Sequence, residues 1–165
     1  MLRKALLMVA VLIVLCGFEL RAQSNIDNLE LFTFVYKPLV LDRTSNLNFG
    51  WVTVGTNGGT VIIAQNGARS NSGDIALVTS TASAANVTIT AQDWTWVMIT
   101  LPNSATLSDG GSNTLSMTFD PSISGQQPTG GTGILEMQIG GTVTVPANTP
   151  VGSYTGSVEL SVVYY

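Results

Sequence analysis

The sequence predicts an all-β protein, an immunoglobulin-like antiparallel β-sandwich of about 8–10 short strands. Beyond residue 22, no stretch repeats apolar residues at helical spacing. Short runs rich in Val, Ile, Thr and aromatic residues recur instead, separated about every 8–12 residues by clusters of Gly, Asn, Ser, Pro and Asp. Thr, Ser, Asn and Gly also fill the polar positions between apolar residues, which suits an extracellular sheet protein.

Ten runs along the chain have strand character, and residues that favour turns separate them. The expected strands are 29–41, 48–54, 60–65, 75–79, 86–90, 94–101, 114–119, 134–139, 142–145 and 154–164. Asn57-Gly58-Gly59 and Asn66-Gly67 tolerate positive φ, so each predicts a tight hairpin turn. The glycine pairs at 110–111 and 130–131 predict longer loops.

The first 22 residues have the pattern of a secretory signal peptide. Arg3 and Lys4 precede an apolar run over residues 5–18, and the chain becomes polar from Glu19. This run of 14 residues is shorter than the roughly 20 that a membrane-spanning helix needs, so no stable membrane span is expected. We expect cleavage after Ala22, one domain over residues 23–165, and a secreted or cell-surface location.

The charge balance beyond the signal peptide excludes two classes of partner. Three basic residues remain, Lys37, Arg43 and Arg69, against nine acidic ones, which gives a net charge of −6. Such a surface cannot neutralise phosphate groups, so nucleic-acid binding is not expected. Electrostatic docking onto anionic lipid is excluded for the same reason.

The composition also argues against an enzyme. The sequence has no histidine, and its single cysteine, Cys16, lies in the signal peptide. Zinc, haem and iron–sulfur sites therefore lack their usual ligands, and Ser-His-Asp or Cys-His catalysis lacks its base. We predict no enzymatic activity, no cofactor and no metal. The single carboxylate in the 109–113 loop favours a turn over a calcium site, because calcium binds six to eight oxygens.

The first expected strand is unusually long and apolar on both faces. Its 13 residues would span about 43 Å, and Pro38 divides it. One interpretation is a first strand that switches sheets at Pro38 within its own sandwich. The other is an N-terminal extension, residues 23–37, that pairs with a neighbouring subunit. The subunit-interface candidates are Leu29, Leu31, Phe32, Phe34, Val35 and Tyr36.

The C-terminal stretch alternates apolar and polar residues, and the resemblance to known proteins is clearest there. The alternating residues, with two glycines in the motif, are Gly152, Tyr154, Gly156, Val158, Leu160, Val162 and Tyr164. A glycine fourteenth from the end and a penultimate tyrosine resemble the terminal strand of chaperone–usher pilins and spore-coat-like surface proteins. Leu47-Asn48-Phe49-Gly50 and Val145-Pro146-Ala147-Asn148 add to a resemblance to bacterial domain-of-unknown-function family 4402.

That resemblance covers nearly the whole chain beyond the signal peptide and implies an immunoglobulin-like surface module. It also implies self-association into a homopolymer, other surface subunits as partners, and a periplasmic chaperone during export. The family has no assigned biochemical activity. Many of the pilins carry a disulfide, which residues 23–165 cannot form because they contain no cysteine.

Three tryptophans are the remaining candidates for a role at the surface. Trp94, Trp96 and Met98 share one face of an expected strand, where they would fill the core or a subunit interface or form a platform for sugar rings. Trp51 is expected in the core.

We therefore predict a secreted or cell-surface structural or adhesive protein, such as a fimbrial subunit. The alternative is a surface binding module that recognises a glycan or protein partner through Trp94 and Trp96.

Overall fold

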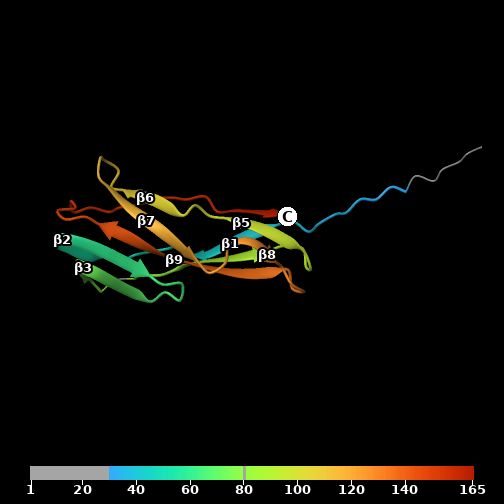
Figure 1. Cartoon of the computed structure of the whole chain (residues 1–165), viewed down its shortest axis with the longest axis horizontal. Coiled ribbons are helices and arrows are strands. Elements are labelled where there is room, and N and C mark those ends of the chain that lie inside the picture. The colour runs from blue at the N-terminus through green and yellow to red at the C-terminus, as the bar shows by residue number, and fades with distance from the viewer. Residues whose placement is uncertain (1–29, 80) are drawn as a thin grey trace, which may run out of the picture. The chain divides into compact units, whose positions relative to one another are not determined.

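The computed structural model describes residues 30–79 and 81–165, and this part of the chain is all-β (Figure 1). The predicted signal peptide and Leu29 lie outside the described residues. The strands are β1 (Val40–Ser45), β2 (Val52–Ile63), β3 (Arg69–Leu77), β4 (Ala85–Thr90), β5 (Trp96–Thr100), β6 (Ser104–Ser108), β7 (Thr114–Pro121), β8 (Gly125–Pro128), β9 (Ile134–Val145) and β10 (Ser161–Tyr164).

All strand pairs are antiparallel, and they form two sheets. The larger sheet has the order β1-β4-β9-β2-β3, with β7 on β9 and β6 on β7; the smaller has the order β10-β5-β8. β9 organises the larger sheet, because β4 pairs with its first half while β2 and β7 pair with its second half. The two sheets pack as a sandwich, which confirms the predicted fold class.

The core consists of two apolar clusters, and only one of them lies between the sheets. The first joins β4 and β9 of the larger sheet to Val97 and Ile99 of β5, with Val162 and Tyr164 packed against it. The second is built on β2, β7 and the second half of β9. Phe49 and Tyr154, which lie outside the strands, pack against it. β5 and β10 of the smaller sheet have five and four residues, whereas β9 has twelve. Since each residue adds about 3.3 Å, the smaller sheet covers only part of the length of β9.

Glycines account for the largest differences between predicted and observed strands. The turn predicted at 57–59 is wrong, because β2 continues through it with an irregular register between Val54 and Gly59. A Cβ on Gly73 would lie 2.6 Å from the Gly58 carbonyl oxygen, so these glycines permit close strand approach. The turn predicted at Asn66-Gly67 is confirmed, with Gly67 at φ 81° and its N–H bonded to the Ala64 carbonyl. The strands predicted at 134–139 and 142–145 form one strand, β9.

Two strands were not predicted at all. β6 is a Ser- and Thr-rich run, and β8 consists of Gly-Gln-Gln-Pro, so neither has the apolar content that marks a strand in the sequence. Each forms a strand because its backbone pairs with a neighbouring strand: β6 pairs with β7, and β8 pairs with β5.

Both terminal strands are shorter than predicted. Residues 30–39 form no strand, so the hypothesis of a first strand in its own sandwich that begins before Pro38 is wrong for the described residues. The C-terminal strand begins only at Ser161, and Thr155 makes an isolated bridge with Ser108. The expectation for Trp51 is also wrong: its side chain is 73% exposed, because β2 begins one residue later and Trp51 lies at the rim of the sheet.

Candidate functional site

An apolar groove lies between the larger sheet and the stretch of residues 151–160 that leads into β10. β1 is the last strand at one end of the larger sheet, and β10 is the last strand at one end of the smaller one. The groove has a volume of about 1560 Å³. The lining residues used below are Leu41, Arg43, Phe49, Trp51, Val158 and Leu160. Leu41, Trp51 and Val158 are exposed although they are large and apolar, so the mouth of the groove is apolar as well.

One wall of the apolar groove is the stretch that leads into β10. Figure 1 shows this orange-to-red stretch as a thin coil that ends in a short arrow at the C-terminus. Thr155 exchanges two backbone hydrogen bonds of 2.8 Å with Ser108, and β10 pairs with β5. Between them, the backbone groups of residues 156–160 make no hydrogen bond to another described residue. This wall therefore offers unused donors and acceptors beside apolar side chains.

The C-terminal motif is only partly buried. Leu160, Val162 and Tyr164 pack against the cluster between the sheets, and Tyr154 packs against the second cluster. Gly152 and Val158 are exposed, so the alternation that predicts a buried face fails in the middle of the motif. A Cβ on Gly156 would lie 2.6 Å from the Thr106 carbonyl oxygen, which explains the glycine there.

The segment that precedes β1 is exposed along its apolar length. We call residues 30–36 the N-terminal segment. Leu31, Phe32, Phe34 and Val35 are between 78% and 89% exposed, and Tyr36 is also exposed. A strand with large apolar side chains on both faces is costly to leave in water, at about 1.5–3 kcal/mol for each side chain that could be buried.

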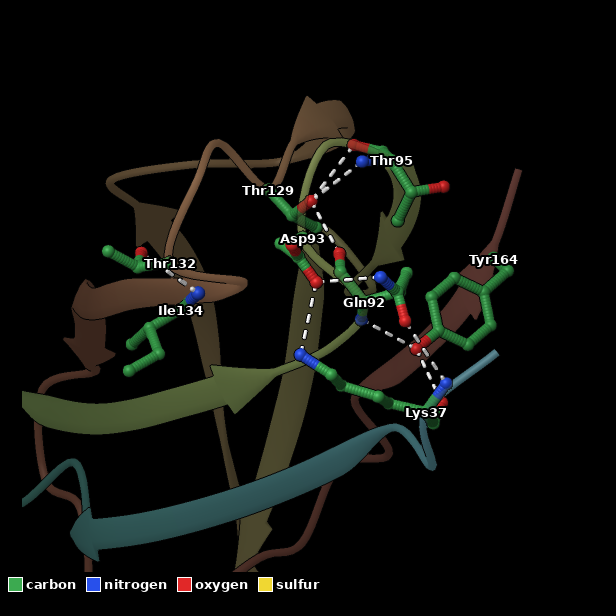
Figure 2. Close-up of polar contacts among 8 residues, drawn as sticks. All are labelled: Lys37, Gln92, Asp93, Thr95, Thr129, Thr132, Ile134 and Tyr164. Atoms are coloured by element: carbon green, nitrogen blue, oxygen red, sulfur yellow. Dashed lines mark hydrogen bonds and ion pairs between the residues drawn. The ribbon is translucent and has the colours of Figure 1, made fainter. Parts of the chain in front are cut away.

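A polar cluster fixes the end of the N-terminal segment to the domain (Figure 2). The Lys37 ammonium group lies 3.0 Å from an Asp93 carboxylate oxygen. The Tyr164 hydroxyl donates to the Lys37 carbonyl at 2.7 Å and accepts from the Gln92 N–H at 2.8 Å. The Tyr36 ring stacks on Tyr164 with 4.9 Å between centroids. The penultimate tyrosine of the motif thus joins the two ends of the domain.

The Thr129 side chain stabilises the turn that contains Asp93. Its buried hydroxyl donates to the Gln92 carbonyl at 2.7 Å and accepts from the Thr95 N–H at 3.0 Å. The hydrogen bond from Lys37 lowers the pKa of Asp93, with its own backbone N–H and the ammonium charge adding to the effect. Because the pKa is lowered on folding, the contact is fully present above the ordinary carboxyl pKa and is lost as the pH falls through the lowered value.

The two tryptophans proposed as a sugar platform lie at the surface. Trp94 is 81% exposed in the turn before β5, with φ at 54°, and Trp96 is 50% exposed at the start of β5. Met98 is half-buried on the same strand, while Val97 and Ile99 point into the core. The Trp94 ring lies against Gly131, where a Cβ would come within 2.9 Å of it.

The 109–113 loop uses its carboxylate internally. Asp109 accepts from the Gly111 N–H at 2.8 Å, from the Asn113 N–H at 3.3 Å and from the Asn113 side-chain amide at 2.6 Å. The Asn113 and Gly111 hydrogen bonds lower the pKa of Asp109. The predicted turn is therefore present.

The described residues lack two features that would indicate other functions. Residues 30–79 and 81–165 contain no cluster of three metal-ligating side chains of the His, Cys, Asp and Glu types. The same residues include no helix with the length and apolar character needed to cross a membrane.

The fold and the groove define a class of protein, a two-sheet β-sandwich that is open along one side. The family model for the domain of unknown function DUF4402 matches residues 39–164, and the chain belongs to that family. The match begins after Pro38, so it includes the sandwich and not the N-terminal segment. No curated protein and no solved structure matches the chain.

The polar cluster was not foreseen from the sequence. Lys37 and Asp93 are 56 residues apart, and Lys37 and Tyr164 are 127 apart. The sequence feature that bears on this cluster is the isolation of one charge: Lys37 is the single charged residue between Glu30 and Asp42.

Proposed function

We propose that this chain is an exported, non-enzymatic structural protein of the cell surface that associates with copies of itself, as a fimbrial subunit does. The observation that carries this proposal is the exposure of the N-terminal segment, which precedes the sandwich in the sequence. In an extended strand its large apolar side chains lie on both faces, and strand addition to a neighbour would bury them. The neutral, Thr- and Ser-rich sheet surface leaves the sheet edges accessible for such pairing.

Export and assembly are tested together on material from the secreted or surface fraction. Mass spectrometry should find an N-terminus near Gln23, and native gels and electron micrographs should show ladders or filaments. An intact Met1 would refute the signal peptide, and a monomer at every concentration would refute the assembly.

A second candidate function rests on the exposure of Trp94 and Trp96. Exposed indole rings can stack on sugar rings, which would make the protein a glycan-binding module. A glycan array separates the two functions: a binding module is retained as a monomer and loses retention on Trp96→Ala, whereas a structural subunit assembles without any glycan.

A further inference from the structure

We propose that the outer face of the smaller sheet binds a neutral glycan, with Trp96 and Tyr165 as the two rings that stack on its sugars. This inference rests on the second candidate function and adds the binding face, the partner ring of Trp96 and the chemical class of the ligand. It does not depend on self-association.

The strand register places the two exposed rings side by side. The Tyr165 N–H donates to the Trp96 carbonyl at 3.0 Å, which continues the pairing of β10 with β5. Residues directly opposite each other on antiparallel strands have Cβ atoms about 5 Å apart on the same face of the sheet. The next opposed pair, Val97 and Tyr164, packs in the core between the sheets, so Trp96 and Tyr165 point outward. Tyr165 is 73% exposed.

The outer face continues from these rings to a polar side chain. On β10, the exposed Val163 lies opposite Met98 of β5. On β8, Pro128 lies opposite Trp96, and the exposed Gln126 lies opposite Met98. An apolar area is thus bordered by an amide that can both donate and accept hydrogen bonds. A sugar ring needs this combination, because it has an apolar C–H face and hydroxyl groups around its edge.

The outward positions of the larger sheet have a different composition. On β7 they include Thr114, Ser116 and Thr118, and on the second half of β9 they are Thr142 and Thr144. The outward apolar residues of β5 and β10 are neighbours across the strand pair and are not scattered singly. An exposed apolar area of this kind marks an interaction site.

The absence of charge on this face selects a neutral ligand. The strands β5, β8 and β10 contain no Asp, Glu, Lys or Arg. An acidic glycan or an anionic lipid surface would need Lys or Arg side chains to balance its charge. The hydroxyl groups of a neutral glycan need only amide and hydroxyl partners.

The size of the face favours a narrow ligand over a second copy of the chain. Three strands about 4.8 Å apart and five residues of about 3.3 Å each define an area of roughly 240 Å². A stable interface between two proteins buries about 800 Å² on each partner. The face is therefore too small to hold two copies together, whereas a few linked sugar rings can lie along it.

Hydrogen bonds hold the start of β5 in position before any ligand binds. The buried Thr129 hydroxyl accepts from the Thr95 N–H at 3.0 Å (Figure 2), and the Thr129 N–H donates to the Thr95 carbonyl at 2.9 Å. Both backbone groups of the residue before Trp96 are therefore fixed. A ring that is already held in place loses less conformational freedom on binding, which favours affinity.

Affinity electrophoresis of the full exported chain tests the site, at a concentration at which the chain sediments as a monomer. Native gels contain a neutral polysaccharide, which is hydroxyethylcellulose, galactomannan or laminarin; carboxymethylcellulose is the charged comparison. At least one neutral polysaccharide should retard the unmodified chain, and carboxymethylcellulose should retard it less. Trp96→Ala and Tyr165→Ala should each weaken binding at least about fivefold, because each removes one stacking ring.

Trp51→Ala is the matched control for loss of an exposed ring. Trp51 is 73% exposed but lies at the rim of the larger sheet, so its variant should be retarded as the unmodified chain is. Circular dichroism establishes that each variant is folded.

Fluorescence locates the contact directly. In a chain with Trp51→Phe and Trp94→Phe, Trp96 is the only tryptophan left. Its emission should shift to shorter wavelength when the polysaccharide that retards the chain is added. Unchanged emission from a chain that is still retarded would show that the glycan binds elsewhere.

The remaining outcomes separate this inference from the proposed functions. If no neutral polysaccharide retards the unmodified chain, the inference is wrong, and self-association of the same chain would leave the structural function standing. Retardation that is lost in Trp94→Ala but kept in Tyr165→Ala would place glycan binding in the turn before β5 and contradict the proposed face. Loss of self-association in Tyr165→Ala, with no glycan bound by the unmodified chain, would make the face a contact between copies instead.

Discussion

Replacing Val162 by Asp is expected to lower the melting temperature by more than about 10 °C and to unfold the protein if its stability is marginal. Val162 lies on β10 opposite Ile99 of β5 and packs against the apolar cluster between the sheets. A carboxylate there has no cation in contact and loses its hydration, at a cost of about 3 kcal/mol or more. That is a large part of the 5–15 kcal/mol that stabilises a typical domain.

Ser161→Asp is the matched control, one residue out of phase on the same strand. Ser161 is exposed, so its variant should melt within about 2 °C of the unmodified protein. Thermal unfolding followed by circular dichroism measures both. Equal melting temperatures for the two variants would show that the side-chain register of β10 is wrong.

Removing residues 23–36 is expected to abolish self-association and leave a folded domain. Residues 30–36 belong to no strand, and the family match begins only at residue 39. The deletion costs the domain the stacking of Tyr36 on Tyr164, worth about 0.5–1.5 kcal/mol, while Lys37 keeps its contacts. Three or four buried apolar side chains at about 1.5–3 kcal/mol each would otherwise hold subunits together, less the cost of ordering the segment.

Two measurements on the truncated chain decide the result. Its melting temperature should stay close to that of the full chain, and light scattering should show a monomer at concentrations at which the full chain assembles. An unfolded truncated monomer, with a full chain that never associates, would mean that the segment stabilises its own domain.

The sequence predicts the sandwich well where side-chain periodicity and burial agree. The strands around Val87, Ile99 and Met117 alternate strictly, and each has its core face where the alternation puts it. Glycine is ambiguous in a sequence, since Asn66-Gly67 makes a turn while Gly58 and Gly73 let two strands approach closely. β6 and β8 lack apolar content and depend on neighbours that no local pattern specifies.

The candidate site was predictable only in part. The large apolar residues on both faces of residues 29–36 single out the segment, because this pattern is local. The apolar groove could not be foreseen, since its walls include β1 and residues 151–160, which are more than 100 residues apart in the chain. The continued alternation through Val158 even predicted a buried position that the single chain leaves exposed.

The central claim is that the chain associates with copies of itself through the N-terminal segment, and sedimentation velocity over a concentration series tests it most directly. The unmodified exported chain is compared with a variant that carries Phe32→Asp and Phe34→Asp, at two residues whose side chains are exposed in the single chain. The account predicts that the sedimentation coefficient of the unmodified chain rises with concentration, while that of the variant stays at the monomer value. The same rise in both chains, or no rise in either, would contradict it.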